Sequence, residues 1–176
     1  MEKIELKIMT RELCHELYKD WENDESIFMD MSLFKPFIYD EKSVDSYFDS
    51  KQNPYRILFA IMLDNKPIGE IHLKNIDKEN KECTLSIHMQ NNKVKNKGYG
   101  TQAEQIAVRY AFDKLGMIAV NADTLIKNTR SQHVLEKVGF KKIKKNNHFI
   151  YYRILYPSLG EKIISHPKSR CWRHFY

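Results

Sequence analysis

Apolar and polar residues alternate over residues 4–9, a period of two that predicts a half-buried strand. Apolar side chains then recur at every fourth position over residues 10–21 and predict a helix. Residues 22–50 are acidic and interrupted by Pro36, and a second, shorter helix is predicted over 43–48. The chain is therefore expected to open with a strand and two helices.

Three runs of β-prone residues come next. Residues 55–63 and 68–73 flank a predicted turn at 64–67, and residues 83–89 follow a second turn at 77–81. Because short turns join antiparallel neighbours, we expect three antiparallel strands in the middle of the chain.

A helix, a strand and another helix are predicted after these strands. The apolar residues of 101–115 fall on one helical face, and Gly116 ends that helix. Residues 118–124 have the pattern of a strand. Residues 128–138 again have helical spacing and end at Gly139.

The end of the predicted domain is a hairpin. Residues 140–143 and 148–156 have strand patterns, and the asparagines at 146–147 tolerate the positive φ of a tight turn. Since 176 residues is about one domain's length, we expect a single domain over 1–156 and a C-terminal tail over 157–176.

Composition removes several classes of protein. No apolar run approaches the ~18 residues of a membrane span, and the N-terminus lacks the apolar stretch of a signal peptide, so we expect a cytoplasmic protein without a membrane partner. The cysteines, Cys14, Cys83 and Cys171, are odd in number and far apart, and the histidines have no metal-binding spacing. We therefore expect neither a disulfide framework nor a metal.

The formal net charge of +6 conceals a division of charge along the chain, with −6 over residues 1–92 and +12 over 93–176. A basic half can indicate nucleic-acid binding. Here, however, the lysines are interleaved with apolar residues at helix and strand spacing, which is typical of solvated faces. We expect no nucleic-acid partner.

The charge changes sign at the glycine turn, the run K-V-K-N-K-G-Y-G-T over residues 93–101. Gly98 and Gly100 let a backbone approach a ligand closely, and Thr101 with Glu104 predicts a capping box that starts a helix. Free amides at a helix N-terminus, with cations nearby, suit phosphate oxygens. The turn therefore predicts a diphosphate site.

A dinucleotide fingerprint is the alternative for this turn. The sequence Gly98-x-Gly100-x-x-Ala103 fits the GxGxxA pattern, and Asp123 follows at about the spacing of a ribose-binding acid. In that fold the turn leaves its strand directly, whereas eight mostly polar residues separate Met89 from Gly98. This context disfavours a nicotinamide or flavin cofactor.

Two motifs resemble the GNAT superfamily of acetyl-CoA-dependent N-acetyltransferases. Residues 95–100, K-N-K-G-Y-G, resemble its [QR]-x-x-G-x-[GA] diphosphate motif, with lysine in the first place. Residues 128–140, N-T-R-S-Q-H-V-L-E-K-V-G-F, resemble its N-x-x-[SA]…E-K-x-G-F helix. Ser131 and Leu135 within that helix are most similar to the branch of ribosomal-protein N-terminal acetyltransferases of RimJ/RimL type.

The resemblance implies an α/β (α+β) fold, a single GNAT-like domain whose mostly antiparallel twisted sheet has about seven strands and about four flanking helices. The implied order is β-α-α-β-β-β-α-β-α-β-β. It also implies that acetyl-CoA is the co-substrate. The residues that would hold it are Ile87, His88, Met89, Lys95, Asn96, Lys97, Gly98, Tyr99, Gly100, Thr101, Asn128 and Ser131.

The same resemblance implies transfer of an acetyl group to a primary amine by direct attack on the thioester. Many members protonate the departing thiolate with a tyrosine where this chain has Leu135, so Ser131 is the candidate acid. The family's base is often a glutamate where this chain has Thr84. Glu82, two residues earlier on the same strand face, is the candidate base.

His72 and His88 are alternative bases. The acceptor is expected to be a cationic amine, such as a protein N-terminus, a polyamine or an antibiotic-like molecule. The reason is that nine acidic residues of segment 20–49 would border its site. A solvated acidic surface is the plainer explanation of these residues. The sequence leaves open a monomer or a homodimer. It also leaves open a catalytically silent acyl-CoA-binding module of the same fold, because the usual tyrosine is missing.

Overall fold

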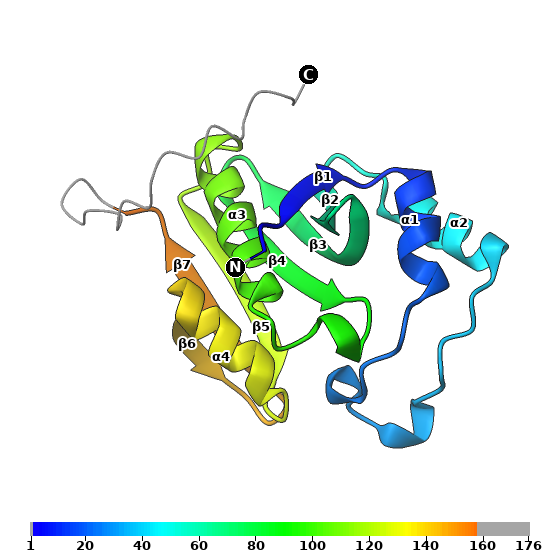
Figure 1. Cartoon of the computed structure of the whole chain (residues 1–176). Coiled ribbons are helices and arrows are strands. Elements are labelled where there is room, and N and C mark those ends of the chain that lie inside the picture. The colour runs from blue at the N-terminus through cyan, green and yellow to red at the C-terminus, as the bar shows by residue number, and fades with distance from the viewer. Residues whose placement is uncertain (1, 158–176) are drawn as a thin grey trace.

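The computed structural model describes residues 2–157, in which one seven-stranded sheet is covered by helices on both faces (Figure 1). Apart from Pro157, the predicted tail lies outside the described residues. The strands are β1 (Glu5–Ile8), β2 (Arg56–Leu63), β3 (Lys66–Asp77), β4 (Glu82–Met89), β5 (Ala119–Leu125), β6 (Lys141–Lys145) and β7 (Phe149–Leu155). Their order across the sheet is β1-β2-β3-β4-β5-β7-β6.

The helices fall where the hydrophobic periodicity predicts them, and the order of strands and helices is confirmed. Three 3-10 helices in the polar connections were not predicted, because their turns rest on single Asp and Asn side chains rather than on a periodic pattern. The helices are α1 (Arg11–Lys19), α2 (Glu41–Lys51), α3 (Tyr99–Asp113) and α4 (Thr129–Val138), and the 3-10 helices are η1 (Glu25–Ile27), η2 (Met31–Leu33) and η3 (Asn92–Val94).

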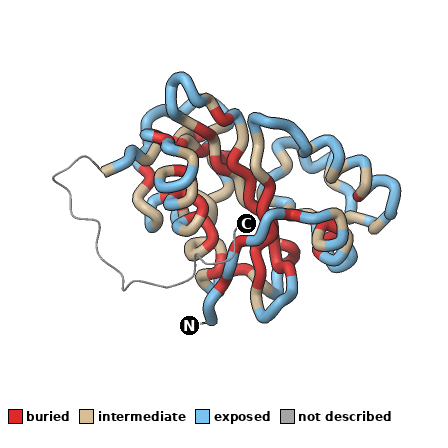
Figure 2. Tube along the Cα trace, turned by 90° about the horizontal axis from the view of Figure 1, so that it is seen from above, coloured by how far each residue is buried: buried red, intermediate tan, exposed pale blue. Residues whose placement is uncertain are grey.

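Alternation along the strands divides the interior into two apolar layers. In β2, Phe59 and Ile61 join the cluster that includes α3, whereas Ala60 and Met62 join the cluster that includes α1 and α2. Figure 2 shows the buried residues concentrated between outer layers that are more exposed. The fold is therefore a sheet with one pair of helices packed against each face.

The strands β4 and β5 are parallel neighbours over only part of their length. Their paired register runs from Glu82 to Thr84 on β4, opposite Ala119 to Asn121 on β5. All other neighbouring strands are antiparallel. Beyond Thr84 the edge of β4 that faces β5 has no strand partner among residues 2–157, so its backbone groups are available to a ligand.

Two of the predicted turns, at 64–67 and at 146–147, differ in how they are made. In the turn at 64–67, positive φ angles occur at Asp64 and Asn65, and the strand resumes at Lys66 rather than after Pro67. In the turn at 146–147, the expected positive φ angles do not occur. Instead the side chain of Asn146 accepts hydrogen bonds from the next backbone amides, which turns the chain without left-handed residues.

The start of α3 also differs from the prediction. The helix begins at Tyr99, and Gly98 precedes it with φ of 82°, a left-handed conformation that favours glycine. The predicted capping box of Thr101 and Glu104 is therefore wrong, because both residues lie inside the helix and no side chain caps it. In the described part of the chain, no helix is long and apolar enough to cross a membrane.

We predict that Gly69→Ala destabilises the protein, because a Cβ at this position would lie 2.7 Å from the backbone oxygen of His88 and force β3 away from β4. Overpacking of this kind costs about 1–3 kcal/mol. Gly100→Ala is the control, since its Cβ would meet only side chains at 3.8 Å or more. Urea unfolding of both variants measures the difference, and equal stabilities would contradict the prediction.

Candidate functional site

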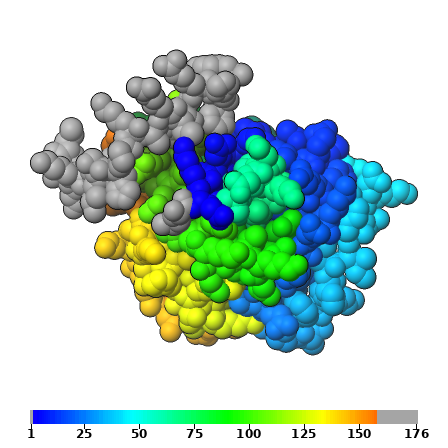
Figure 3. All heavy atoms as spheres, viewed as in Figure 1, coloured from blue at the N-terminus to red at the C-terminus, as the bar shows by residue number. Residues whose placement is uncertain are grey.

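A cavity of about 430 Å³ lies where β4 parts from β5. On the face in Figure 3, the green surface of the glycine turn lies between the yellow surface of α4 and the blue surface of the segment after α1. The cavity is lined, among others, by Tyr18, Trp21, Phe37, Tyr47, Glu70, Ile87, His88, Met89, Lys95, Asn96, Gly98, Gly100, Thr101, Glu104, Asn128, Arg130 and Ser131.

Most residues predicted to hold acetyl-CoA thus surround one cavity, and two do not line it. Lys97 is absent from the lining, and the buried side chain of Tyr99 points instead to the N-terminal segment, where its hydroxyl donates a hydrogen bond to Glu2. The backbone amide of Tyr99 still belongs to the first turn of α3. The prediction for Tyr99 therefore concerns its backbone alone.

The first turn of α3 supplies an anion site at the mouth of the cavity. The carbonyl of Gly98 accepts a hydrogen bond from the amide of Gln102, so the amides before Gln102 precede the intrahelical ladder. The amides of this first turn and the positive end of a fifteen-residue helix favour phosphate oxygens. Gly100 brings this backbone close to the cavity, and an added Cβ would touch Ile87 and Met89.

The cation of Lys95 is already paired. Its Nζ donates to Asp24 Oδ2 at 2.8 Å and to Asn92 Oδ1 at 3.0 Å, and its side chain is only 6% exposed. Arg130 of α4 binds the same Asp24 oxygen. Burial alone would raise the pKa of Asp24, but the hydrogen bonds from Lys95 and Ser26 outweigh burial and hold that pKa well below its usual range.

Asn128 and Ser131 meet at the start of α4. The Oδ1 atom of Asn128 accepts a hydrogen bond from the amide of Ser131 at 3.1 Å and caps the helix. This leaves the Nδ2 group of Asn128 as its donor toward the cavity. Leu135, one turn further on, is buried.

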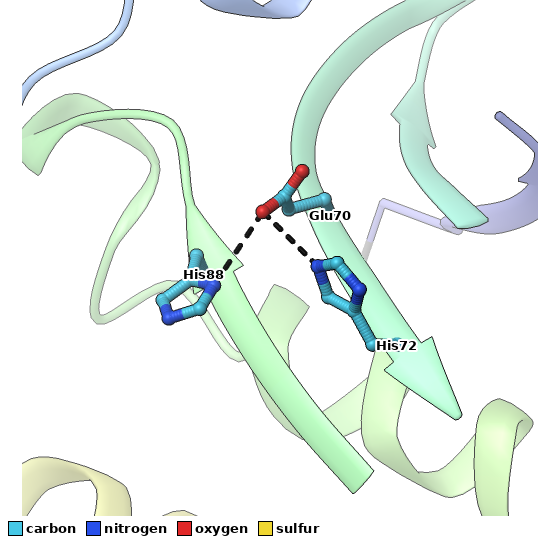
Figure 4. A group of neighbouring side chains, drawn as sticks. All are labelled: Glu70, His72 and His88. Atoms are coloured by element: carbon cyan, nitrogen blue, oxygen red, sulfur yellow. Dashed lines mark hydrogen bonds and ion pairs between the residues drawn. The ribbon is translucent and has the colours of Figure 1, made fainter. Parts of the chain in front are cut away.

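Glu70, in the middle of β3, is 1% exposed. Its Oε1 atom accepts hydrogen bonds from the hydroxyl of Tyr47 at 2.6 Å and from Nε2 of His72 at 3.2 Å, and Nδ1 of His88 lies 3.5 Å away (Figure 4). Its Oε2 atom is buried and has no hydrogen-bond partner among the residues that the structure describes. Burial would raise the pKa of Glu70, but the hydrogen bonds with the two histidines outweigh it and lower that pKa.

The proton on His72 is fixed by its neighbours. Arg56 lies with its guanidinium 3.0 Å from Nδ1 of His72, and a guanidinium only donates, so Nδ1 is the acceptor and Nε2 carries the proton. Burial lowers the pKa of His72, although the hydrogen bond with Glu70 opposes this effect. His72 is therefore a neutral donor to Glu70.

A family model described as the acetyltransferase (GNAT) domain matches residues 3–141. The chain belongs to this family. No protein of curated function matches its sequence.

The GNAT fold is also found in solved structures that resemble this one. Spermidine N-acetyltransferase from Vibrio cholerae, in complex with CoA and spermine, has a TM-score of 0.70 at 16% identity, over 86% of this chain and 95% of that chain. The N-acetyltransferase PseH from Campylobacter jejuni has a TM-score of 0.64 at 18% identity, over 88% of this chain and 99% of that chain. At such identities the likeness shows the fold alone.

The structure does not bring the predicted base, Glu82, to the cavity of this GNAT domain. Glu82 is at the start of β4, six residues from His88, which is about 20 Å of extended strand. Its Oε2 atom pairs instead with Arg153 at 2.8 Å and accepts from Asn121. Strand alternation correctly predicts that Glu82 lies on the same face of β4 as His88, but Glu82 is at the opposite end of the strand from the cavity.

Cys83 is not a nucleophile in this domain. The residue is 1% exposed, and burial raises the pKa of its thiol to about 12, so the thiol stays protonated at neutral pH. Cys83 is therefore a small buried side chain of the core.

Glu70, His72 and His88 also offer atoms that lie within 4.8 Å of one another, a spacing suited to a metal ion. Arg56 works against a cation there, because it brings a positive charge and keeps the Nε2 atom of His72 protonated. The cluster is better suited to hydrogen bonding. The expectation that no metal is used stays a prediction.

Glu104 is a second buried carboxyl in the cavity lining. It is 1% exposed, and its Oε2 atom has no hydrogen-bond partner within residues 2–157. Burial raises the pKa of Glu104 to about 8, so the carboxyl is protonated at neutral pH. The sequence predicts a capping role for Glu104 at the start of α3 and gives no indication that its carboxyl is buried.

We predict that Asp24→Asn destabilises the protein by about 3 kcal/mol at neutral pH, because it leaves the buried cation of Lys95 without its anion. The folded-state pKa of Asp24 is lowered, so its contribution is complete above the unfolded pKa and is lost as pH falls below about 4. Urea unfolding at several pH values measures both effects. Asp123→Asn, at an exposed position of β5, is the control; similar losses in both variants would contradict the prediction.

We predict that Glu104→Gln stabilises the protein increasingly as pH rises from about 5 to about 8. In this window the unfolded chain releases the carboxyl proton while the folded chain keeps it, so wild-type stability falls by about 1.4 kcal/mol per pH unit relative to the variant. Denaturant unfolding at pH 5 and pH 8 tests this, with Glu5→Gln at an exposed position of β1 as the control. A pH-independent difference would show that Glu104 is ionised when folded.

Proposed function

We propose that this GNAT protein is an acetyl-CoA-dependent N-acetyltransferase that transfers an acetyl group to a primary amine by direct attack on the thioester. One observation carries the proposal: a single cavity joins the anion site at the start of α3 to a buried carboxylate, Glu70. Such a cavity suits an anionic donor at one end and a cationic acceptor at the other.

The donor half of the cavity has the groups that coenzyme A requires. The amides of Tyr99, Gly100 and Thr101 would bind the diphosphate. The edge of β4 from Ile87 to Met89 would hydrogen-bond the pantetheine amides, because β5 does not pair with this part of β4. The neighbouring structure from Vibrio cholerae contains CoA, which supports the same ligand here.

A cationic amine is the acceptor class that the other half favours. Its wall carries aromatic side chains and Glu70, and the acidic segment after α1 borders it. The Vibrio cholerae structure contains spermine, which supports a polyamine; a protein N-terminus or an antibiotic-like amine fits the same chemistry. We also place the protein in the RimJ/RimL-like branch as part of this proposal, on the basis of Ser131 and Leu135.

Ser131 is the proposed acid for the departing thiolate. It lines the cavity at the start of α4, and its backbone amide rather than its hydroxyl is used in the helix cap. Its hydroxyl therefore has a proton to offer near the pantetheine arm.

The second candidate is a catalytically silent acyl-CoA-binding module, favoured by the apolar Leu135 where many members have tyrosine. A thiol-release assay with polyamines, aminoglycosides and N-terminal peptides separates the two functions. Turnover with any of these amines excludes the silent module, whereas acetyl-CoA binding without turnover supports it.

We predict that acetyl-CoA raises the melting temperature of the wild-type protein, and that Gly100→Glu removes this shift, because a carboxylate at the mouth of the cavity repels the diphosphate. A ligand at one hundred times its Kd stabilises by about 2.7 kcal/mol. Gln105→Glu, which adds the same charge at an exposed position of α3, is the control. Absence of a shift in wild type at millimolar acetyl-CoA would contradict the proposed function.

A further inference from the structure

The unpaired oxygen of Glu70 is an unusual feature of the acceptor half of the cavity. A buried acceptor without a hydrogen bond costs about 1–3 kcal/mol, and more when it is charged. The side chain of Glu70 lines the cavity, yet its Oε2 atom has no hydrogen-bond partner in the described residues. The missing partner is expected to come from a ligand.

The other groups around Glu70 keep it anionic. The Oε1 atom accepts from Tyr47 and His72, and both are fixed as donors: burial and the nearby carboxylate raise the pKa of Tyr47, and Arg56 holds the proton of His72 on Nε2. These donors occupy one oxygen and leave the other free. A carboxylate in this state attracts a cation that donates hydrogen bonds.

His88 is directly opposite Glu70 in the register of β3 and β4. Its Nδ1 atom lies 3.5 Å from Oε1 of Glu70. A proton on Nδ1 would face that carboxylate, which only accepts, and the neutral ring would then have its lone pair on Nε2. The His88 side chain is 38% exposed and lines the cavity. His88 lies within the segment Ile87–Met89 whose unpaired edge would hold pantetheine, so its ring would be available to a substrate bound beside the donor.

The walls of this half of the cavity are aromatic. Tyr18 stacks on Trp21 with ring centroids 4.6 Å apart, and Tyr18 also packs against Phe37 and Tyr47. Aromatic faces attract organic cations, and they exclude water from a carboxylate at their base. The lining therefore favours an alkylammonium group over an inorganic cation.

From these observations we propose that Glu70 and His88 form the acceptor site: Oε2 of Glu70 binds a primary alkylammonium group, and Nε2 of His88 removes its proton. This inference rests on the proposed N-acetyltransferase function and specifies its acceptor class and its base.

The proposed step balances in protons and electrons. Nε2 of His88 takes one proton from the ammonium, and the resulting imidazolium is stabilised by Glu70. The amine lone pair forms the new C–N bond with the thioester carbonyl, and the C–S bond breaks as the thiolate leaves. The thiolate takes a proton from Ser131, which recovers one from the product nitrogen; His88 returns its proton to solvent.

The test compares Glu70→Gln and His88→Gln with Glu79→Gln and His133→Gln, two exposed controls outside the cavity. Three quantities are measured in each: the melting shift caused by acetyl-CoA, the calorimetric affinity of the CoA-bound protein for spermine and for butylamine, and thiol release with the same amines. The acetyl-CoA shift reports whether a variant is folded and binds the donor.

We expect both variants to keep the acetyl-CoA shift. Glu70→Gln should weaken amine binding at least about 10-fold, because it removes the charge that attracts the ammonium. His88→Gln should bind amines normally but lose about 10²-fold in kcat, and added imidazole should restore part of the activity of His88→Ala. If Glu70→Gln does not fold, Glu70→Asp replaces it, since the shorter side chain keeps the charge but withdraws the oxygen.

Unchanged amine affinity in the folded Glu70 variant would overturn the binding site, and unchanged kcat in His88→Gln would overturn the base. Wild-type protein that binds acetyl-CoA but no amine would overturn this inference and leave donor binding intact. Amine binding without turnover in the wild-type protein would support Glu70 as the binding group, overturn His88 as a base, and favour the silent acyl-CoA-binding module over the proposed function. A wild-type protein without an acetyl-CoA shift would instead contradict the proposed function.

Discussion

The separation of β4 from β5 is the constraint on which the rest of the site depends. The cavity and the free edge of β4 exist only because pairing stops after Thr84. The chain just after β4 is held by the C-terminal end of α1 and the residues that follow it. The side chains of Gln90 and Asn91 donate to the carbonyls of Leu17 and Asp20, and the carbonyl of Gln90 accepts from the backbone amide of Glu22. Both side chains are buried, where such bonds are costly to lose. The C-terminal end of α1 therefore keeps β4 apart from β5.

A second constraint links the two oppositely charged halves of the chain. Asp24, from the acidic half, pairs with Lys95 before the glycine turn and with Arg130 of α4, both from the basic half. The segment after α1 is thereby held across the cavity, against the two motifs that resemble the GNAT family. Part of the charge division seen in the sequence is thus used within the molecule, and it need not indicate an external partner.

The sequence predicts the order of elements because each strand and helix carries its own periodicity. It also identifies residues that line the cavity at the starts of α3 and α4, because Gly98 and Asn128 belong to local motifs. It fails where position depends on distant contacts. Alternation gives a face but not a location along the strand, so Glu82 was a wrong expectation for the cavity. The sequence does not point to Glu70, because its partners Tyr47 and His88 come from α2 and β4, although an ionisable pair two residues apart in the otherwise apolar run 68–73 is a usable indication.

The two buried carboxyls show how one cavity can accept ligands of opposite charge. Glu70 is surrounded by donors, so its pKa falls and the acceptor end is negative. The Oε2 atom of Glu104 has no hydrogen-bond donor in the described residues, and burial raises the pKa of Glu104 to about 8, so this carboxyl adds no anion beside the start of α3. Environment alone therefore gives two glutamates opposite protonation states at neutral pH. In the proposed function, an ammonium group would be attracted to the Glu70 end, and a diphosphate would meet the amides of α3 beside a neutral carboxyl at the other end.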